Sequence, residues 1–383
     1  MRLVTPLIVA AALACASAAG AAPIPSNSLL LGTPPLVEAR AWYVQNGATG
    51  EVLLAQNARA SVPIASITKL MTVLVTLERA GLDDPVTVHP SAVGVGGSTI
   101  YLRAGERLRV RELVQAALIQ SANDAAWALA LHVGRGSETR FAALMNAKAR
   151  RLGLTDTHFV RPDGLDVPGH VSSARDVTKL ARVAMNNRFV RDTVRLSSVS
   201  AGGRSLHTWN DLLARFPGVI GVKTGHTSGA GWSQVAAVRG RGLTIYAAIL
   251  GSPERELRNE DLSELLAWGL SRYRVVRLIR PGHVYARVVT AYDRPPVRLV
   301  ARGTVMGVVR LGRPLVERVV APRSVELPVR RGQRLGEVRV YAGRKLLGRR
   351  PLVATETLTK PDLAGRLRWY AGETLENAWD VFR

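Results

Sequence analysis

Cysteine is almost missing from this sequence of 383 residues, since Cys15 is the only one. A disulfide scaffold, a cysteine-based zinc site and a cysteine nucleophile in the mature protein are therefore disfavoured. Long apolar runs are also missing, which excludes a polytopic membrane protein. Charged residues make up 21% and hydrophobic residues 47%, a balance typical of folded domains. We expect two or three globular domains that need neither a metal nor another cofactor.

Lysine is scarce although the chain is strongly basic. There are 52 basic and 29 acidic residues, a net charge of +23, yet only six of the basic residues are lysines. Each lysine is thus more informative than usual, because a buried lysine can lose its proton whereas arginine cannot. The excess positive charge favours a polyanionic partner, either nucleic acid, anionic lipid or an anionic wall polymer.

Residues 1–22 have the pattern of a secretory signal peptide. Arg2 precedes an apolar run and then small residues, so cleavage is expected after Ala21. An uncleaved anchor and a lipoprotein modified at Cys15 are the weaker alternatives. Export predicts an extracytoplasmic location, periplasmic or attached to the cytoplasmic membrane, and disfavours nucleic acid as the partner.

The rest of the chain divides by composition. A linker is expected at 23–37, followed by a domain at 38–273 with strands at both ends and amphipathic helices between them. This pattern indicates an α+β fold, a mainly antiparallel sheet with packed helices. Residues 274–360 are short strands separated by Gly and Pro, a small all-β domain with 21 basic and 5 acidic residues over 272–360. Residues 361–383 form an amphipathic helix that packs on the protein or lies on a membrane surface.

The first chemical motif is Ser66-Ile67-Thr68-Lys69. A Ser and a Lys three residues apart at the start of a helix share one face. A desolvated amine can act as the base that makes a serine hydroxyl nucleophilic. Taken alone the motif is weak, because most such pairs are a helix cap followed by a solvated lysine.

Two further motifs follow. Ser121-Ala122-Asn123 interrupts two apolar helical stretches, where a hydroxyl and an amide could relay a proton and hold a carbonyl. Lys223-Thr224-Gly225 lies on an apolar strand and could bind a carboxylate beside a bare glycine. The alternatives are an ordinary helix break and a strand end.

Together, in this order, the three motifs are typical of penicillin-binding proteins and related β-lactamases. The blocks at 63–74, 97–106, 121–127, 163–176 and 221–231 resemble one branch, the low-molecular-mass D-alanyl-D-alanine carboxypeptidases. The resemblance implies a β-lactamase/DD-peptidase-like catalytic domain and, by layout only, a β domain with a membrane-anchoring tail. One departure is Arg161, where the family usually has Asn.

The resemblance also implies catalytic roles. Ser66 would be acylated by the penultimate D-Ala carbonyl of a peptidoglycan stem peptide, or by a β-lactam antibiotic. Lys69 would be the general base, and Ser121 would carry the proton to the departing D-Ala. Water would then release the acyl group.

The remaining motif residues would bind substrate. Asn123 would hold the substrate backbone, and Lys223 and Thr224 would bind the terminal carboxylate beside Gly225. The oxyanion hole would consist of the backbone N–H groups of Ser66 and His226. The other histidines, His170 among them, are interpreted as structural.

Other functions on the same residues stay open. A DD-endopeptidase would cut cross-links on this scaffold, and a β-lactamase would turn over penicillin rapidly. A wall- or membrane-binding protein with an inactive site is the least favoured, because all six polar motif residues are intact. The partners expected are thus stem peptides, β-lactams and a membrane surface reached through 361–383.

Overall fold

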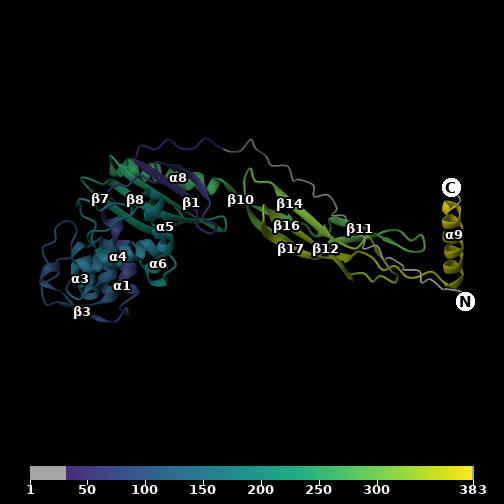
Figure 1. The fold of residues 1–383 in the computed structure, drawn as a ribbon, viewed down its shortest axis with the longest axis horizontal. Helices are drawn as coiled ribbons and strands as arrows, with labels where there is room; N and C mark the ends of the chain where they lie inside the picture. The colour runs from purple at the N-terminus through teal and green to yellow at the C-terminus, as the bar shows by residue number, and fades with distance from the viewer. Residues whose placement is uncertain (1–31, 382–383) are drawn as a thin grey trace, which may run out of the picture. The chain divides into compact units, whose positions relative to one another are not determined.

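A computed structural model describes residues 32–381 of the chain (Figure 1). The chain forms two compact units, one ending at Arg274 and the other beginning at Val275. The expected signal peptide, residues 1–22, lies outside the described residues, as does the first part of the expected linker. The predicted α+β class is confirmed, because both helices and antiparallel sheets are present.

The first unit contains one five-stranded antiparallel sheet. Its strand order is β2-β1-β9-β8-β7. The strands are β1 (Ala41–Asn46), β2 (Val52–Gln56), β7 (Val219–Thr227), β8 (Gly231–Gly240) and β9 (Leu243–Ser252). The first and last parts of this unit therefore meet in the sheet, where β1 pairs with β9 along its whole length. Strand β7 pairs with β8 and lies at the sheet edge.

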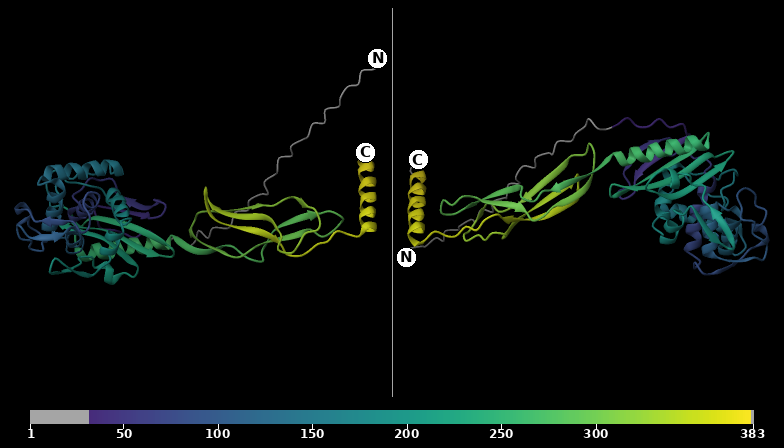
Figure 2. Two further views of the ribbon diagram at one scale, coloured as in Figure 1. Left: turned by 90° about the horizontal axis from the view of Figure 1, so that it is seen from below. Right: turned by 180° about the vertical axis from the view of Figure 1, so that it is seen from behind.

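Helices cover both faces of this sheet, which explains why every residue of β1 is buried. Tyr43 and Ala248 belong to the core on the side of α5 (Ala174–Ala184). On the other side, α8 (Arg255–Ser271) approaches so closely that a Cβ on Gly269 would lie 2.8 Å from Ile245 and 3.2 Å from Val44. Figure 2 shows α8 lying along the sheet.

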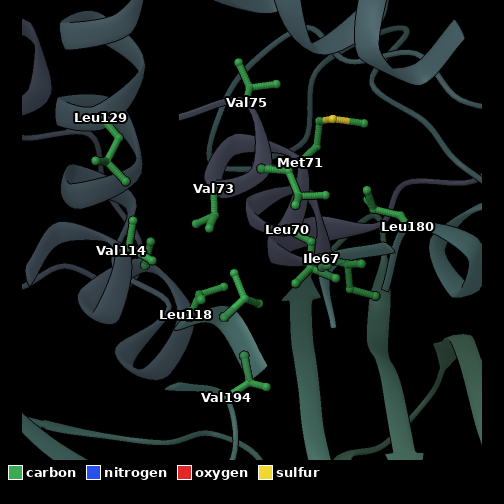
Figure 3. Packing of buried hydrophobic residues seen from close by; sticks show 14 of the residues in the cluster. Ile67, Leu70, Met71, Val73, Val75, Val114, Leu118, Leu129, Leu180 and Val194 are labelled. Carbon is green, nitrogen blue, oxygen red and sulfur yellow. The ribbon is translucent and has the colours of Figure 1, made fainter. Parts of the chain in front are cut away.

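A helical cluster packs beside β7. It contains α1 (Lys69–Leu77), α2 (Val110–Gln115), a π-helical turn (Ala116–Gln120), α3 (Asn123–Gly134) and α4 (Glu138–Leu152). Apolar side chains from α1, α2, α3 and α5 meet in one core (Figure 3). The α1 helix is central to this core because eight of its nine residues are buried. Its first residue, Lys69, is consequently shielded from solvent.

The local structure differs from expectation at one important place. The pattern predicts a helix from Ser66 to about Ala80, whereas Ala65–Thr68 is a 3-10 turn and the α-helix begins only at Lys69.

Several short elements were also not predicted. They are β3 (Pro85–Thr87), a 3-10 turn (Pro90–Ala92), β4 (Arg107–Arg109), α6 (Arg188–Thr193), β5 (Ser198–Ala201), β6 (Arg204–His207) and α7 (Leu212–Arg215).

The second unit is largely β-structure with its own core. Its six-stranded sheet has the order β14-β16-β17-β12-β11-β15, and β10 pairs with β13. The strands are β10 (Tyr273–Ile279), β11 (Val284–Thr290), β12 (Val297–Ala301), β13 (Val305–Arg310), β14 (Leu315–Val320), β15 (Ser324–Val325), β16 (Arg334–Ala342) and β17 (Lys345–Ala354). The register places Arg318, Arg339 and Arg349 in one row across three strands. Glu337 pairs with Arg339 and neutralises part of this row. The remaining like charges are unfavourable side by side unless a further anion neutralises them.

The final helix is α9 (Leu363–Val381). Leu363, Leu367 and Tyr370 are exposed on it. Within residues 32–381, no helix combines the length and apolarity needed to cross a membrane.

Candidate active site

Ser66 lies on a turn that the surrounding structure holds in a strained conformation. Its neighbour Ala65 has φ +48°, a left-handed value that L-residues rarely adopt. The opposing loop approaches closely, because a Cβ on Gly164 would lie 2.0 Å from the Ala65 oxygen. Such strain persists only where the surroundings impose it, and it concentrates at functional sites. The turn leaves Ser66 half-buried between buried neighbours.

Lys69 is completely buried and contacts three oxygen atoms. Its Nζ lies 2.7 Å from Ser66 Oγ, 2.6 Å from Asn123 Oδ1 and 2.8 Å from the Asp163 carbonyl oxygen. Burial lowers the pKa of Lys69 to about 7, against the opposing effects of the Asp163 and Asp124 carboxylates. An amine with this pKa is substantially neutral at physiological pH, so it can accept a proton from the hydroxyl beside it.

Ser121 and Asn123 enter the site where the helix is broken. The π-helical turn ends at Gln120, the next residue Ser121 has φ +62°, and α3 then begins at Asn123. The Asn123 amide donates to the Gly96 carbonyl at 2.8 Å, and its oxygen accepts from Lys69. The backbone N–H of Asn123 donates to the Ser98 carbonyl at 2.7 Å. Asn123 thus joins the loop around Gly96 to the buried amine.

A second buried amine lies next to Ser121. Lys223 Nζ is 2.9 Å from Ser121 Oγ and 2.9 Å from the Thr224 carbonyl oxygen. Burial lowers the pKa of Lys223 well below its ordinary value, and the positive charges of Lys69 and Arg258 lower it further. A buried amine with a lowered pKa gains a proton more readily when an anion binds beside it, so Lys223 is suited to an anionic ligand.

Strand β7 passes directly against the serine turn. A Cβ on Gly225 would lie 2.9 Å from the Ile64 oxygen and 3.1 Å from the Ser66 nitrogen. Glycine is thus required for this approach, and the backbone N–H of Ser66 lies beside the strand that carries His226. The imidazole of His226 is exposed and stacks on Trp232 with the ring centres 3.9 Å apart.

Asp163 accepts a hydrogen bond from Lys69 through its backbone carbonyl oxygen, and the motifs did not predict this residue. Its side chain is fully buried, accepts from the Trp127 indole at 2.8 Å and pairs with Arg161. Burial raises the pKa of Asp163, but Arg161, Lys69 and Trp127 outweigh this effect, so the net pKa is lowered. Only the tertiary fold brings these groups together.

Arg258 is a second unpredicted residue. It is 1% exposed, pairs with Asp211, donates to Asn259 at 2.6 Å and lies over the Trp232 ring. In a chain so rich in arginine, no pattern distinguishes this one.

His170 also lies in this region. Its Nε2 is 2.8 Å from Thr68 Oγ1, and its Nδ1 accepts from the Val160 N–H at 3.1 Å. Burial lowers the pKa of His170 to about 4, so the ring is neutral at physiological pH. These bonds tie the His170 loop to the turn that precedes Lys69.

The structure brings all three motifs together. Contacts join Ser66, Lys69 and Asn123 on one side and Ser121 and Lys223 on the other, and Gly225 borders Ser66. The sequence profile of the D-alanyl-D-alanine carboxypeptidase family matches residues 31–254. The chain belongs to this family. The family and the serine-type D-Ala-D-Ala carboxypeptidase activity predicted from the motifs are thereby confirmed.

Individual relatives agree with this assignment. The D-alanyl-D-alanine carboxypeptidase DacD of Salmonella typhimurium is 31% identical over 358 residues, which cover 88% of this carboxypeptidase and 90% of that protein. A solved structure of penicillin binding protein 5 from Haemophilus influenzae is 26% identical, with a TM-score of 0.63, and covers 86% of this chain and 100% of its own. The Streptomyces K15 DD-transpeptidase is 32% identical, with a TM-score of 0.60, over 63% of this chain and 100% of its own.

Proposed function

We propose that this carboxypeptidase removes the terminal D-Ala of peptidoglycan stem peptides through an acyl-enzyme on Ser66. The observation that carries the proposal is the 2.7 Å distance between Ser66 Oγ and a buried Lys69 amine with a pKa of about 7. Lys69 takes the proton of Ser66, and Oγ attacks the penultimate D-Ala carbonyl carbon. The negative charge that develops on the carbonyl oxygen is stabilised by the N–H groups of Ser66 and His226.

The departing D-Ala needs a proton when the peptide bond breaks. Ser121, held by Lys223 at 2.9 Å, passes on the proton that Lys69 took from Ser66, so the leaving nitrogen is protonated and Lys69 is neutral again. Water then attacks the ester, and the neutral Lys69 takes one proton from that water. As the ester bond breaks, Lys69 returns this proton to Ser66 Oγ and the acyl group leaves as a carboxylic acid, which restores the starting state.

Strand β7 binds the carboxyl terminus of the peptide. Lys223 and Thr224 hold the terminal carboxylate, and Gly225 lets the substrate backbone approach. Arg258 adds positive charge behind Lys223, which strengthens the preference for an anionic terminus. Asn123 donates its remaining amide hydrogen to a substrate carbonyl while its oxygen positions Lys69.

Covalent labelling tests the acyl-enzyme. A fluorescent penicillin, which is also the expected inhibitor, should acylate the purified protein but not its Ser66→Ala variant. Ser61→Ala is a matched control, because Ser61 is exposed and its hydroxyl bonds only weakly to the Asp156 carbonyl. Undiminished labelling of Ser66→Ala would exclude Ser66 as the nucleophile.

The likeness to the Streptomyces K15 DD-transpeptidase makes transfer to an amine the second candidate. The same acyl-enzyme would then pass its acyl group to an amino acceptor instead of water. Product analysis with free and cross-linked stem peptides, with and without an added amine, separates carboxypeptidase, endopeptidase and transpeptidase activity. Release of D-Ala unaffected by the amine supports the carboxypeptidase.

The protein is further proposed to be exported and attached to the cytoplasmic membrane through residues 361–383. Exposed Leu363, Leu367 and Tyr370 on α9 support an interfacial helix, and the arginine row on the β domain supports attraction to anionic lipid. Deleting 362–383 should release the protein from membranes, and high salt should weaken the remaining attraction. Membrane binding that survives the deletion would exclude the helix as the anchor.

A further inference from the structure

Two exposed aromatic side chains flank the segments that carry Ser121 and Asn123. Tyr101 is 85% exposed and Trp209 is 45% exposed. Neither belongs to the catalytic machinery described above. Large aromatic side chains so exposed beside a polymer-processing site are candidates for contacts with the substrate.

The backbone of Tyr101 is strained and firmly held. Its φ is +55°, the left-handed region that a bulky residue adopts only under constraint. The buried Asp124 carboxylate accepts the N–H groups on either side, from Ile100 at 3.1 Å and from Leu102 at 3.0 Å. Arg204 donates to the Ile100 carbonyl at 2.6 Å and to the Tyr101 carbonyl at 3.3 Å. These bonds hold the backbone of the loop in a conformation that leaves the Tyr101 side chain in solvent.

This loop is joined to the catalytic site. Asp124 follows Asn123, and the Gly96 and Ser98 carbonyls accept hydrogen bonds from Asn123. The Trp209 indole donates to the Gln120 carbonyl at 3.0 Å, and Ser98 Oγ donates to that same carbonyl at 2.7 Å. Trp209 is therefore anchored to the backbone immediately beside Ser121, and the loop that carries Tyr101 is joined to the same carbonyl through Ser98.

An open hollow of about 690 Å³ lies at Tyr101, lined by Ile100, Tyr101, Arg103, Ala104, Glu106 and Arg204. Its lining combines one aromatic ring with charged groups. A sugar ring has a matching character, since one face presents C–H groups and its edge presents hydroxyls. An aliphatic peptide side chain would instead favour an apolar hollow.

We propose that Tyr101 and Trp209 form a subsite for the glycan that carries the stem peptide. Arg255 lies over one face of the Trp209 ring and Arg204 pairs with Glu106. The Tyr101 ring and the other face of Trp209 therefore stack on sugar residues, and the Arg103 guanidinium and the Glu106 carboxylate bond to their hydroxyls. This inference rests on the proposed function, because the glycan is a ligand only if the stem peptide is the substrate. The subsite makes the enzyme prefer polymer-attached peptides over free ones.

The test compares kcat/KM for one D-Ala-D-Ala peptide, free and attached to glycan chains. For Tyr101→Ala, the ratio of kcat/KM on attached peptide to kcat/KM on free peptide should fall about tenfold. Trp209→Ala should also lower this ratio. Tyr101→Phe keeps the ring and should retain most of the ratio. Trp268→Ala, on α8, is the matched control and should leave the ratio unchanged.

A second measurement separates binding from loop support. Glycan chains stripped of peptides should inhibit the wild type and inhibit Tyr101→Ala less. Two results for Tyr101→Ala would overturn the subsite. One is an unchanged ratio of kcat/KM between attached and free peptide. The other is an equal loss of kcat/KM on both substrates while stripped glycan inhibits as strongly as in the wild type. Penicillin labelling of the same preparations reports on Ser66 separately, so failure of the subsite is distinguished from failure of the acyl-enzyme.

Discussion

Arg161 bonds both carboxylate oxygens of Asp163, at 2.5 and 2.8 Å, while the Asp163 carbonyl oxygen lies 2.8 Å from Lys69 Nζ. Arg161 is the position where the family pattern usually has Asn. The departure therefore adds a partly buried ion pair next to Lys69, the proposed general base. Its positive charge also lowers the pKa of Lys69, whereas the Asp163 carboxylate raises it.

Replacing Arg161 should raise the pKa of Lys69 and destabilise the fold. In Arg161→Asn, the Asp163 charge acts on Lys69 unopposed, so penicillin acylation at pH 7 should slow and recover at higher pH. The unpaired buried carboxylate should lower the free energy of unfolding by about 3 kcal/mol. Acylation rates across pH and urea unfolding measure the two effects. Arg161→Lys keeps the charge, so it should shift the pH dependence of the acylation rate less than Arg161→Asn does. Equal shifts in the two variants would contradict the electrostatic argument.

The wild-type acylation rate should follow the neutral fraction of Lys69. Burial lowers the pKa of Lys69 to about 7, so the neutral amine predominates above this pH and is lost below it. The rate should therefore fall about tenfold for each pH unit below 7 and level off at higher pH. Stopped-flow labelling with a chromogenic penicillin, whose own charge is constant over this range, provides the profile. A rate independent of pH from 5 to 9 would exclude Lys69 as the base.

Gly225→Ala should slow acylation strongly. Its Cβ would lie 2.9 Å from the Ile64 oxygen and 3.1 Å from the Ser66 nitrogen, so the serine turn has to shift and the proposed oxyanion-hole donor moves with it. Loss of one such donor typically costs about a hundredfold in rate. Gly240→Ala on β8 is the control, because its Cβ would meet only the flexible Leu270 side chain at 3.3 Å. Near-normal labelling of Gly225→Ala would disprove the close approach of β7.

The sequence predicted those features that depend on local pattern. Turn residues and apolar periodicity predict a hairpin over 39–56 and helices over 138–152 and 174–185, where the structure has β1–β2, α4 and α5. The three motifs follow from residue identity alone. The 3-10 turn at Ser66 could not be predicted, because Gly164 and Gly225 from distant segments impose it. Asp163 and Arg258 act through tertiary proximity to the two lysines, for which a single sequence holds no signal.

Binding of a peptide's terminal carboxylate is expected to place a proton on Lys223. Burial, together with Lys69 and Arg258, lowers the pKa of Lys223, and an adjacent carboxylate would raise it again. Peptide binding should therefore take up a proton at pH values between the pKa of Lys223 in the free enzyme and its higher pKa in the complex, and affinity should fall as pH rises through this range. Calorimetry of the Ser66→Ala variant in two buffers of different ionisation enthalpy measures this uptake.

Two comparisons make the proton measurement specific. A peptide ending in an amide lacks the charge and should bind weakly without proton uptake. Lys223→Arg carries a permanent charge, so its binding heat should not depend on the buffer. If the wild-type lysine and the arginine variant gave the same buffer dependence, the proton would have to reside elsewhere. Lys223 would then be charged before the substrate arrives, and its burial would not control carboxylate binding.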